Sequence, residues 1–379
     1  MNMKPVKCAC DTFDQSTRVK RVGAVRSVLL RMPAVVSILL SLNLASLAAP
    51  LLPVPVSTVP STTGDTNPYG VLFITRNLGG SLKKGDVLVS NFNNSGGVMF
   101  LGKTIVDIRN GEQTATPFYT SSTPREGLSL ALGQLQNFII IGNVPTSGST
   151  AGPGALTVLD SFGTLVNKLT DSTATFIDGP WGLAINQISG TKAQLFVSNV
   201  LNGTVWRLDV TVSAGGLTIN DSVKVGSGYL FELTFPTVVN GPAGLAYDAR
   251  HDILYVASEL DNEIFAITNA SSISHNQSTP GIVVYNDPEH LHGPTGLLLL
   301  KNGDLLTAND DGVNPNPADP SEIVEFFPQP PTGTFVTQYS VDPTPGGAFG
   351  IGLARKDNQT KLGYVDDNKN TFSILSLFF

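Results

Sequence analysis

Hydrophobic residues downstream of residue 66 fall into short runs, and turns rich in Gly, Pro, Asn and Asp separate these runs. One arrangement, a turn followed by Gly and an apolar run, occurs six times at intervals of 52 to 62 residues. The six copies begin with Asn67-Pro68-Tyr69-Gly70-Val71, Pro124-Arg125-Glu126-Gly127-Leu128, Gly179-Pro180-Trp181-Gly182-Leu183, Gly241-Pro242-Ala243-Gly244-Leu245, Gly293-Pro294-Thr295-Gly296-Leu297 and Gly347-Ala348-Phe349-Gly350-Ile351. Short strands that recur at such a period are typical of the blades of a β-propeller.

Each copy continues with further strand-like runs. The second run ends in a polar or small residue, and these six residues are Asn91, Asn143, Asn199, Ser258, Asn309 and Asp366. A third run, rich in β-branched and aromatic residues, occupies residues 104–108, 155–159, 204–208, 263–267, 322–326 and 371–375. A fourth run follows in five copies. The pattern predicts an all-β fold, a six-bladed β-propeller of four-stranded antiparallel blades.

The sixth copy ends after its third run, so its sheet lacks an outer strand. An unpaired strand edge promotes aggregation, and closed folds avoid such edges. We expect the extended segment at residues 51–59 to pair beside residues 371–375, because an edge strand tolerates its prolines. Residues 50–66 are then a Pro/Ser/Thr-rich linker and ring-closing strand, and residues 67–379 form the propeller.

Residues 1–49 have the order of a signal peptide, with a basic region, an apolar run and small residues at its end. We expect cleavage after Ala48 or Ala49, which would give a secreted or periplasmic protein; the alternative is an uncleaved membrane anchor. Both cysteines, Cys8 and Cys10, lie in this segment, so the mature chain would contain no disulfide. We expect it to be a monomer.

The mature chain would carry 16 basic and 28 acidic residues, a net charge near −12. An acidic surface argues against nucleic acid, and after signal cleavage against an anionic membrane, as a partner. The sequence contains no Gly-x-Ser-x-Gly elbow, phosphate-binding loop or zinc-ligand spacing. Nucleophilic and nucleotide chemistry therefore have no support from motifs.

Three features resemble NHL repeats, which build six-bladed propellers: the recurring Gly-Pro-x-Gly-Leu-Ala opening, the strand Tyr255-Val256-Ala257-Ser258 and the turn Asp261-Asn262-Glu263-Ile264. The resemblance extends over almost everything from residue 67 onward. The chain is also similar to exported bacterial proteins of this design. Such a resemblance implies a fold and leaves activity open, because propellers serve as enzymes, binding modules and scaffolds alike.

The innermost strand of each blade lines the central channel, so the residues before the Gly of the six openings should form one ring. This predicted ring consists of Tyr69, Glu126, Trp181, Ala243, Thr295 and Phe349. Aromatic side chains contribute much of the energy at interaction surfaces. Our leading hypothesis is that the protein is a non-catalytic module without a cofactor. It would bind a small molecule, glycan or protein through the channel face, with Tyr69, Trp181 and Phe349 as an aromatic rim.

Six-bladed gluconolactonases and related hydrolases hold a divalent metal, usually calcium, at this end of the channel. The resemblance therefore implies an alternative function, a calcium-dependent hydrolase or lyase of the gluconolactonase or NHL-lyase type. Calcium requires several converging oxygen ligands. The candidates are Glu126, Asn91, Asn143, Asn199, Asn309 and Asp366. The Asn residues suit turn starts equally well, because their side chains bond their own backbone.

His290 and His292 precede the fifth opening on the expected channel face. At positions i and i+2 of an extended segment, both imidazoles would point to the same side and could bind a ligand or a metal. The alternative is that both are solvent-exposed loop residues.

Overall fold

The structure is a computed structural model that describes residues 54–234, 238–356 and 359–377. The predicted signal peptide at residues 1–49 lies outside this part of the chain. The described residues form strands and turns and contain no helix. A membrane-spanning helix is accordingly not found among them.

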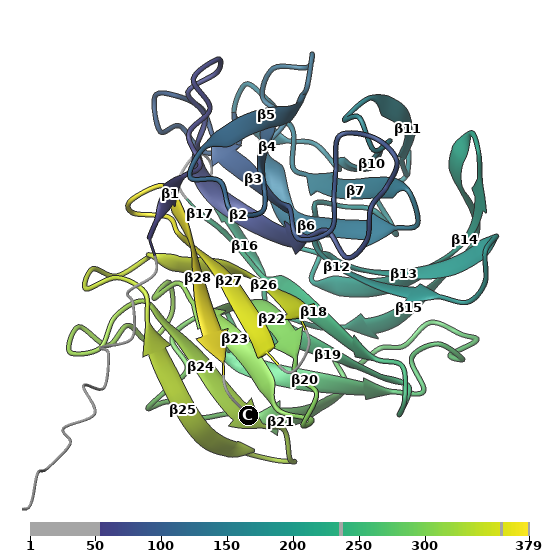
Figure 1. The fold of residues 1–379 in the computed structure, drawn as a ribbon. Coiled ribbons are helices and arrows are strands. Elements are labelled where there is room, and N and C mark those ends of the chain that lie inside the picture. The colour runs from purple at the N-terminus through teal and green to yellow at the C-terminus, as the bar shows by residue number, and fades with distance from the viewer. Residues whose placement is uncertain (1–53, 235–237, 357–358, 378–379) are drawn as a thin grey trace, which may run out of the picture. The chain divides into compact units, whose positions relative to one another are not determined.

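Six four-stranded antiparallel sheets are arranged around a central axis as the blades of a propeller (Figure 1). Blades 1 to 3 consist, from the axis outward, of β2 (Thr66–Phe73), β3 (Val87–Asn93), β4 (Thr104–Ile108) and β5 (Ala115–Thr120); β6 (Leu128–Leu135), β7 (Phe138–Asn143), β10 (Ala155–Leu159) and β11 (Leu165–Leu169); and β12 (Pro180–Gln187), β13 (Lys192–Asn199), β14 (Thr204–Ser213) and β15 (Gly216–Ser227). The predicted fold class is therefore confirmed.

Blades 4 to 6 follow the same order: β18 (Pro242–Asp248), β19 (Ile253–Ser258), β20 (Glu263–Thr268) and β21 (Ile282–Tyr285); β22 (Pro294–Leu299), β23 (Leu305–Asn309), β24 (Glu322–Phe327) and β25 (Thr334–Ser340); and β26 (Ala348–Lys356), β27 (Gln359–Asp366), β28 (Thr371–Leu377) and β1 (Val56–Ser57). Two small hairpins interrupt the blade pattern. They are β8 (Thr146–Ser147) with β9 (Thr150–Ala151), and β16 (Glu232–Thr234) with β17 (Val238–Asn240).

The sixth blade takes its outer strand from the N-terminal segment. Val56 pairs with Phe372, and Ser57 pairs with Thr371, in an antiparallel ladder. The backbone N–H and the hydroxyl of Thr58 then donate to the carbonyl of Asn370 at 2.9 and 3.0 Å. The predicted pairing of the two chain ends is confirmed.

The hydrophobic cores lie between neighbouring blades. For example, Phe196 and Val205 of blade 3 belong to the same buried cluster as Leu254 and Phe265 of blade 4. A middle strand such as β3 is buried along its whole length, because each blade packs against a neighbour on both faces. Burying one such side chain contributes about 1.5–3 kcal/mol, so blade stacking is the main source of stability.

Hydrogen bonds join the innermost strands around the axis. The Ser198 hydroxyl accepts from the N–H of Gly182 at 2.8 Å and donates to the Ala243 carbonyl of the next blade at 2.7 Å. A Cβ at Gly182 would lie 1.9 Å from that carbonyl oxygen, so the close approach of the two strands requires glycine. The hydroxyls of Ser90 and Ser129 donate to the next blade in the same way, at 2.8 and 2.7 Å.

Candidate functional site

The strand pairings show which residues are equivalent around the channel. In blades 1, 3, 4, 5 and 6 the second residue of each opening pairs with the polar residue near the end of the second strand. These pairs are Pro68–Asn91, Pro180–Asn199, Pro242–Ser258, Pro294–Asn309 and Ala348–Asp366. The next residue of each opening is therefore equivalent around the channel, and these residues are Tyr69, Trp181, Ala243, Thr295 and Phe349. Five members of the predicted ring are therefore equivalent, and all five are buried.

Glu126 is not a member of this ring, which corrects the prediction. In blade 2, Leu128 pairs with Asn143, so Ser129 occupies the ring position. The carbonyl of Gly127 accepts from the N–H of Val144, so Gly127 corresponds to the Gly that precedes the Pro in blades 3, 4 and 5, and the ring position lies three residues after Glu126. The Glu126 carboxylate is instead buried in a salt bridge with Lys168 of β11, with 2.8 Å between Oε1 and Nζ.

The predicted aromatic residues fill the axis. The ring of Tyr69 stacks on that of Phe349, with centroids 3.8 Å apart and planes 5° apart, and meets Trp181 edge-on at 5.7 Å. Phe92 stacks on Tyr69 with ring centroids 4.7 Å apart and meets Trp181 edge-on at 5.3 Å. We call Tyr69, Phe92, Trp181 and Phe349 the aromatic plug. The predicted convergence is confirmed, but the buried rings form a core and not an exposed rim.

The polar residues at the ends of the second strands are held within the blades. Asn143 Oδ1 accepts from the N–H of Ala155 at 2.7 Å, and Asn199 Oδ1 accepts from the N–H of Asp178 at 3.1 Å. Asn91 Nδ2 donates to the carbonyl of Thr58 at 2.9 Å.

The corresponding polar residues of blades 5 and 6 also have partners within the protein. Asn309 Nδ2 donates to the His290 carbonyl and to Glu322, while Asp366 forms an ion pair with Lys369 at 3.1 Å. The structure does not bring these residues and Glu126 together as one calcium ligand set.

The residues that follow these polar residues form a second ring, which we call the mouth ring. In blades 2 to 6 their backbone N–H groups donate to the carbonyl of the Gly that begins each blade, which establishes their equivalence. The six members are Phe92, Val144, Val200, Glu259, Asp310 and Asp367. Blades 1 to 3 therefore contribute an apolar half, and blades 4 to 6 contribute an acidic half.

Three carboxyl groups of the acidic half approach the aromatic plug from different blades. Burial and the charges of Asp367, Asp310 and Glu259 raise the pKa of Tyr69, although Tyr69 belongs to blade 1. With its amide nitrogen toward Asp367, Asn67 donates to both carboxylate oxygens at 2.7 and 3.0 Å and accepts from the Tyr69 hydroxyl at 3.0 Å. The acidic side chains therefore face the axis.

The carboxyl groups of Glu259 and Asp310 lie on the same side of Gly312, because a Cβ at Gly312 would be 3.1 Å from Glu259 Oε1 and 3.0 Å from Asp310 Oδ1. Burial, followed by the charge of Asp310, raises the pKa of Glu259 well above its usual range. Burial raises the pKa of Asp310 to about 7. Burial and the charges of Asp310 and Asp366 also raise the pKa of Asp367. Within the described ranges, no Lys, Arg or His side chain forms an ion pair with any of the three.

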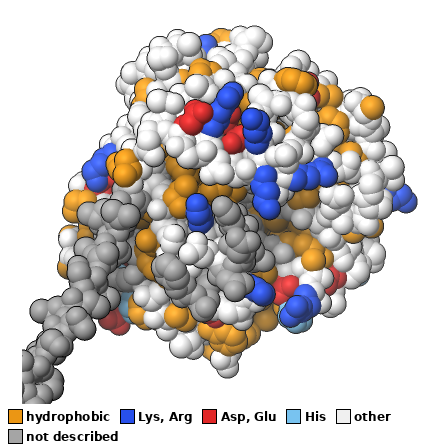
Figure 2. All heavy atoms as spheres, in the orientation of Figure 1, with side chains coloured by type: hydrophobic (Ala, Val, Ile, Leu, Met, Phe, Trp, Pro, Cys, Tyr) orange, Lys and Arg blue, Asp and Glu red, His pale blue; other side chains and the backbone are white. Residues whose placement is uncertain are grey.

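The apolar half continues into the hairpin of β16 and β17. Phe231, directly before β16, lies beside Gly203 and, together with Val200, beside Gly241. The β16–β17 hairpin, taken with the two residues that lead into it, exposes Leu230, Phe231 and Leu233, with 56%, 49% and 38% of their surfaces accessible. Single exposed hydrophobic residues are common, as on the face in Figure 2, where they are interspersed with charged side chains. Three within four positions form a larger apolar surface.

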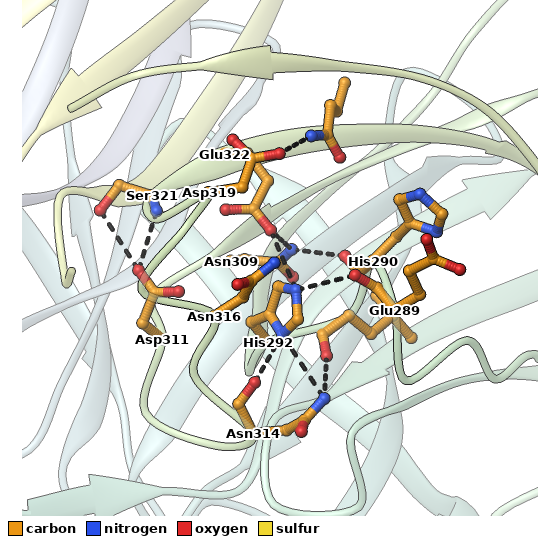
Figure 3. A network of polar contacts seen from close by, with 12 residues as sticks. Glu289, His290, His292, Asn309, Asp311, Asn314, Asn316, Asp319, Ser321 and Glu322 are labelled. Atoms are coloured by element: carbon orange, nitrogen blue, oxygen red, sulfur yellow. Dashed lines mark hydrogen bonds and ion pairs between the residues drawn. The ribbon is translucent and has the colours of Figure 1, made fainter. Parts of the chain in front are cut away.

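The two predicted histidines have different partners (Figure 3). His292 is buried, with Nδ1 2.5 Å from the carbonyl oxygen of Asn314 and Nε2 3.1 Å from that of Glu289. Its Nε2 also lies 3.5 Å from Glu322, whose pKa burial raises to about 7. His290 instead pairs with Asp287 at 2.8 Å and stacks on Phe335. The two imidazoles do not form one site.

Surface cavities occur between blades and away from the mouth ring. One of 460 Å³ lies between blades 5 and 6 and is lined by Tyr339, Tyr364 and Leu375. A second of 280 Å³ lies beside β1, and a third of 180 Å³ lies at β20 and β21. None of these three includes a residue of the mouth ring.

No protein-family model and no curated protein matches the chain. Among solved structures, the fold is similar to a gluconolactonase from Xanthomonas campestris, at 13% identity over 86% of this chain and 95% of that one, with a TM-score of 0.50. A luciferin-regenerating enzyme matches at 9% identity over 86% and 95% of the two chains, with a TM-score of 0.48. At these identities the likeness concerns the propeller fold alone.

Proposed function

We propose that the protein is a non-catalytic binding module that takes up a protein or small-molecule ligand at the channel mouth. The observation that carries this proposal is the division of the mouth ring into an apolar half beside an exposed hairpin and an acidic half without basic partners. Binding surfaces typically combine apolar contact area with a few polar groups that set orientation.

The aromatic plug supports binding at the mouth and not within the channel. Tyr69, Trp181 and Phe349 are buried against one another, and so are Phe92, Val144 and Val200. A ligand would therefore contact the acidic half of the mouth ring and the exposed residues of the β16–β17 hairpin. Of the polar residues that a metal-dependent reaction would use, Glu126 and Asn143 already have partners for a side-chain oxygen, whereas Asn91 Oδ1 and Asn309 Oδ1 have none among the described residues.

The test is a binding screen of the purified protein on peptide and glycan arrays, repeated with two variants. Phe231→Ser removes an exposed apolar side chain at the mouth, whereas Phe162→Ser removes one that is 66% exposed in blade 2 outside the mouth ring. We expect the first variant, and not the second, to lose the bound probes. Binding that both variants retain would place the site elsewhere. Turnover of gluconolactone that a chelator abolishes would establish the hydrolase alternative instead.

We also propose that the protein is exported and that the mature chain begins near Ala49 or Pro50. The support is the order of basic, apolar and small residues in the sequence. N-terminal sequencing of protein recovered from the medium or periplasm tests this. Recovery of chains that retain the apolar segment would contradict it.

A further inference from the structure

We propose that Glu259 and Asp310 form a binding site for an organic cation, an ammonium or guanidinium group, on a ligand whose apolar part rests on the β16–β17 hairpin. This inference rests on the proposed function, because it assigns a ligand chemistry to the same mouth.

Glu259 provides the first argument. Its side chain is 1% exposed, yet no side-chain donor among the described residues reaches either carboxyl oxygen. A buried carboxylate costs several kcal/mol unless it is paired, and removing its proton without a cation is therefore unfavourable. Burial and the neighbouring charge of Asp310 raise the pKa of Glu259, so the free protein favours the protonated carboxyl group. A cation from a ligand would replace that proton.

The space beside the two carboxyl groups provides the second argument. A Cβ at Gly312 would lie 3.1 Å from Glu259 Oε1 and 3.0 Å from Asp310 Oδ1, so the absence of a side chain there keeps the gap beside both groups open. The N–H of Gly312 donates to Asp310 Oδ1 at 2.8 Å and fixes that carboxyl group. Asp310 is half-buried, which gives a ligand access to the pair from the mouth.

The chemistry of the surroundings favours an organic cation over a metal ion. Calcium binds six to eight oxygens, and among the described residues no three carboxylate or imidazole groups are grouped as metal ligands. A guanidinium group, in contrast, needs only one or two carboxylates for strong charge-assisted hydrogen bonds. Asp367, held by Asn67, adds a third negative group nearby.

The hairpin defines what the cation should be attached to. The backbone N–H of Leu230 donates to Asp261 at 3.1 Å, so the hairpin is fixed beside the turn that carries Glu259. Phe231, which is 49% exposed, lies beside Gly241, and the carbonyl of Gly241 accepts from the N–H of Glu259. A Leu- or Phe-flanked arginine in a peptide would engage both surfaces, whereas a small amine would engage the carboxyl pair alone.

The experiment is isothermal titration calorimetry of the purified protein at pH 7 with three probes. They are a blocked Leu-Arg-Phe-Leu peptide, the same peptide with neutral citrulline in place of arginine, and agmatine as a small guanidinium compound. We expect the arginine peptide to bind about tenfold or more tightly than the citrulline peptide. Because the pKa values of Glu259 and Asp310 are raised, titration in two buffers of different ionisation enthalpy should show that binding of the cation releases a proton. Tighter binding of agmatine than of the peptide would identify a small molecule as the source of the cation.

Variants give the inference its controls. Glu259→Gln and Asp310→Asn should each remove the preference for arginine, while Glu112→Gln, the same change at an exposed residue of blade 1, should leave it intact. The cation site would be overturned if the wild-type protein bound both peptides with equal affinity. If Phe231→Ser then abolished this binding, the proposed function would still stand. Peptide binding that neither Phe231→Ser nor Glu259→Gln affects would overturn both.

Two further outcomes would overturn the cation site. One is the absence of binding by all three probes at millimolar concentration. The other is tight binding of calcium alone that Glu259→Gln removes, which would identify a metal site.

Discussion

The apolar and acidic halves of the mouth ring occupy equivalent backbone positions and have opposite effects on stability. Phe92, Val144 and Val200 belong to a hydrophobic cluster and stabilise the axis. Glu259, Asp310 and Asp367 are carboxyl groups whose pKa values burial raises, so ionising them opposes folding. The fold itself requires no carboxylate at these positions, because the other half is built without any. A costly feature of this kind is typical of a functional site, where stability is sacrificed for binding.

The largest expected effect concerns the apolar half. Phe92→Ala would leave a cavity between Tyr69, Trp181 and Phe100, and we expect the free energy of unfolding to fall by about 3–5 kcal/mol. Urea unfolding monitored by circular dichroism measures this. Phe162→Ala, at an exposed position, is the control and should change stability by less than about 0.5 kcal/mol. A small loss for Phe92→Ala would mean that the plug does not support the axis.

The acidic half should make stability depend on pH. The pKa of Asp310 is about 7 in the folded protein against 3.8 ordinarily, so the folded state holds the proton more tightly. The resulting stabilisation is complete below about pH 4 and is lost as the pH rises through 7, by about 4 kcal/mol. Between pH 4 and 8 the free energy of unfolding should therefore fall more steeply with rising pH in the wild type than in Asp310→Asn. Parallel curves would show that Asp310 is not held protonated.

Removing one charge of the carboxyl pair should stabilise the protein. At pH 8 we expect Glu259→Gln to raise the free energy of unfolding by about 1–2 kcal/mol, because the amide needs no counter-charge in a buried place. Thermal unfolding at pH 8 provides the measurement, with Glu112→Gln as an exposed control. A destabilised Glu259→Gln would indicate that the carboxylate is already satisfied.

The smallest effect on stability is expected at Gly312. Its φ does not require glycine, and the nearest atoms to an added Cβ are the ends of the Asp310 and Glu259 side chains. Gly312→Ala should thus change stability by less than about 1 kcal/mol but weaken binding of the arginine peptide about tenfold. Gly190→Ala, with open space around its Cβ, is the matched control. Unchanged affinity in Gly312→Ala would show that the gap is not used.

The fold could be predicted from sequence because six copies of one pattern report on the same architecture. The convergence of Tyr69, Trp181 and Phe349 followed from the same repeat and is confirmed. Glu126 was misassigned because Gly127 was aligned with the second Gly of the other openings, whereas its hydrogen bond with Val144 makes it equivalent to the first, three residues away in register.

The mouth ring could not be predicted in this way. The second strands of blades 4, 5 and 6 end at Ser258, Asn309 and Asp366, so the acidic residues that follow lie in loops. The alternation of side chains along a strand does not fix the direction of a loop residue. The sequence therefore directed attention to Asn309 and Asp366, whereas the neighbours Asp310 and Asp367 face the channel. Pairs such as Ser258-Glu259 and Asp366-Asp367 were visible in the sequence, but their orientation was not.

The pairing of Val56 and Ser57 with Phe372 and Thr371 also has a consequence for the time course of folding. During synthesis the first five blades can form in order, since each uses strands that are close in sequence. The sixth must bring together segments that are separated by more than three hundred residues, and the entropy of closing so long a loop has to be overcome at that step. The nascent chain therefore remains an open arc with two exposed edges until its last strands emerge, and we expect a chaperone or slow translation of the final segment to matter most for the yield of this protein.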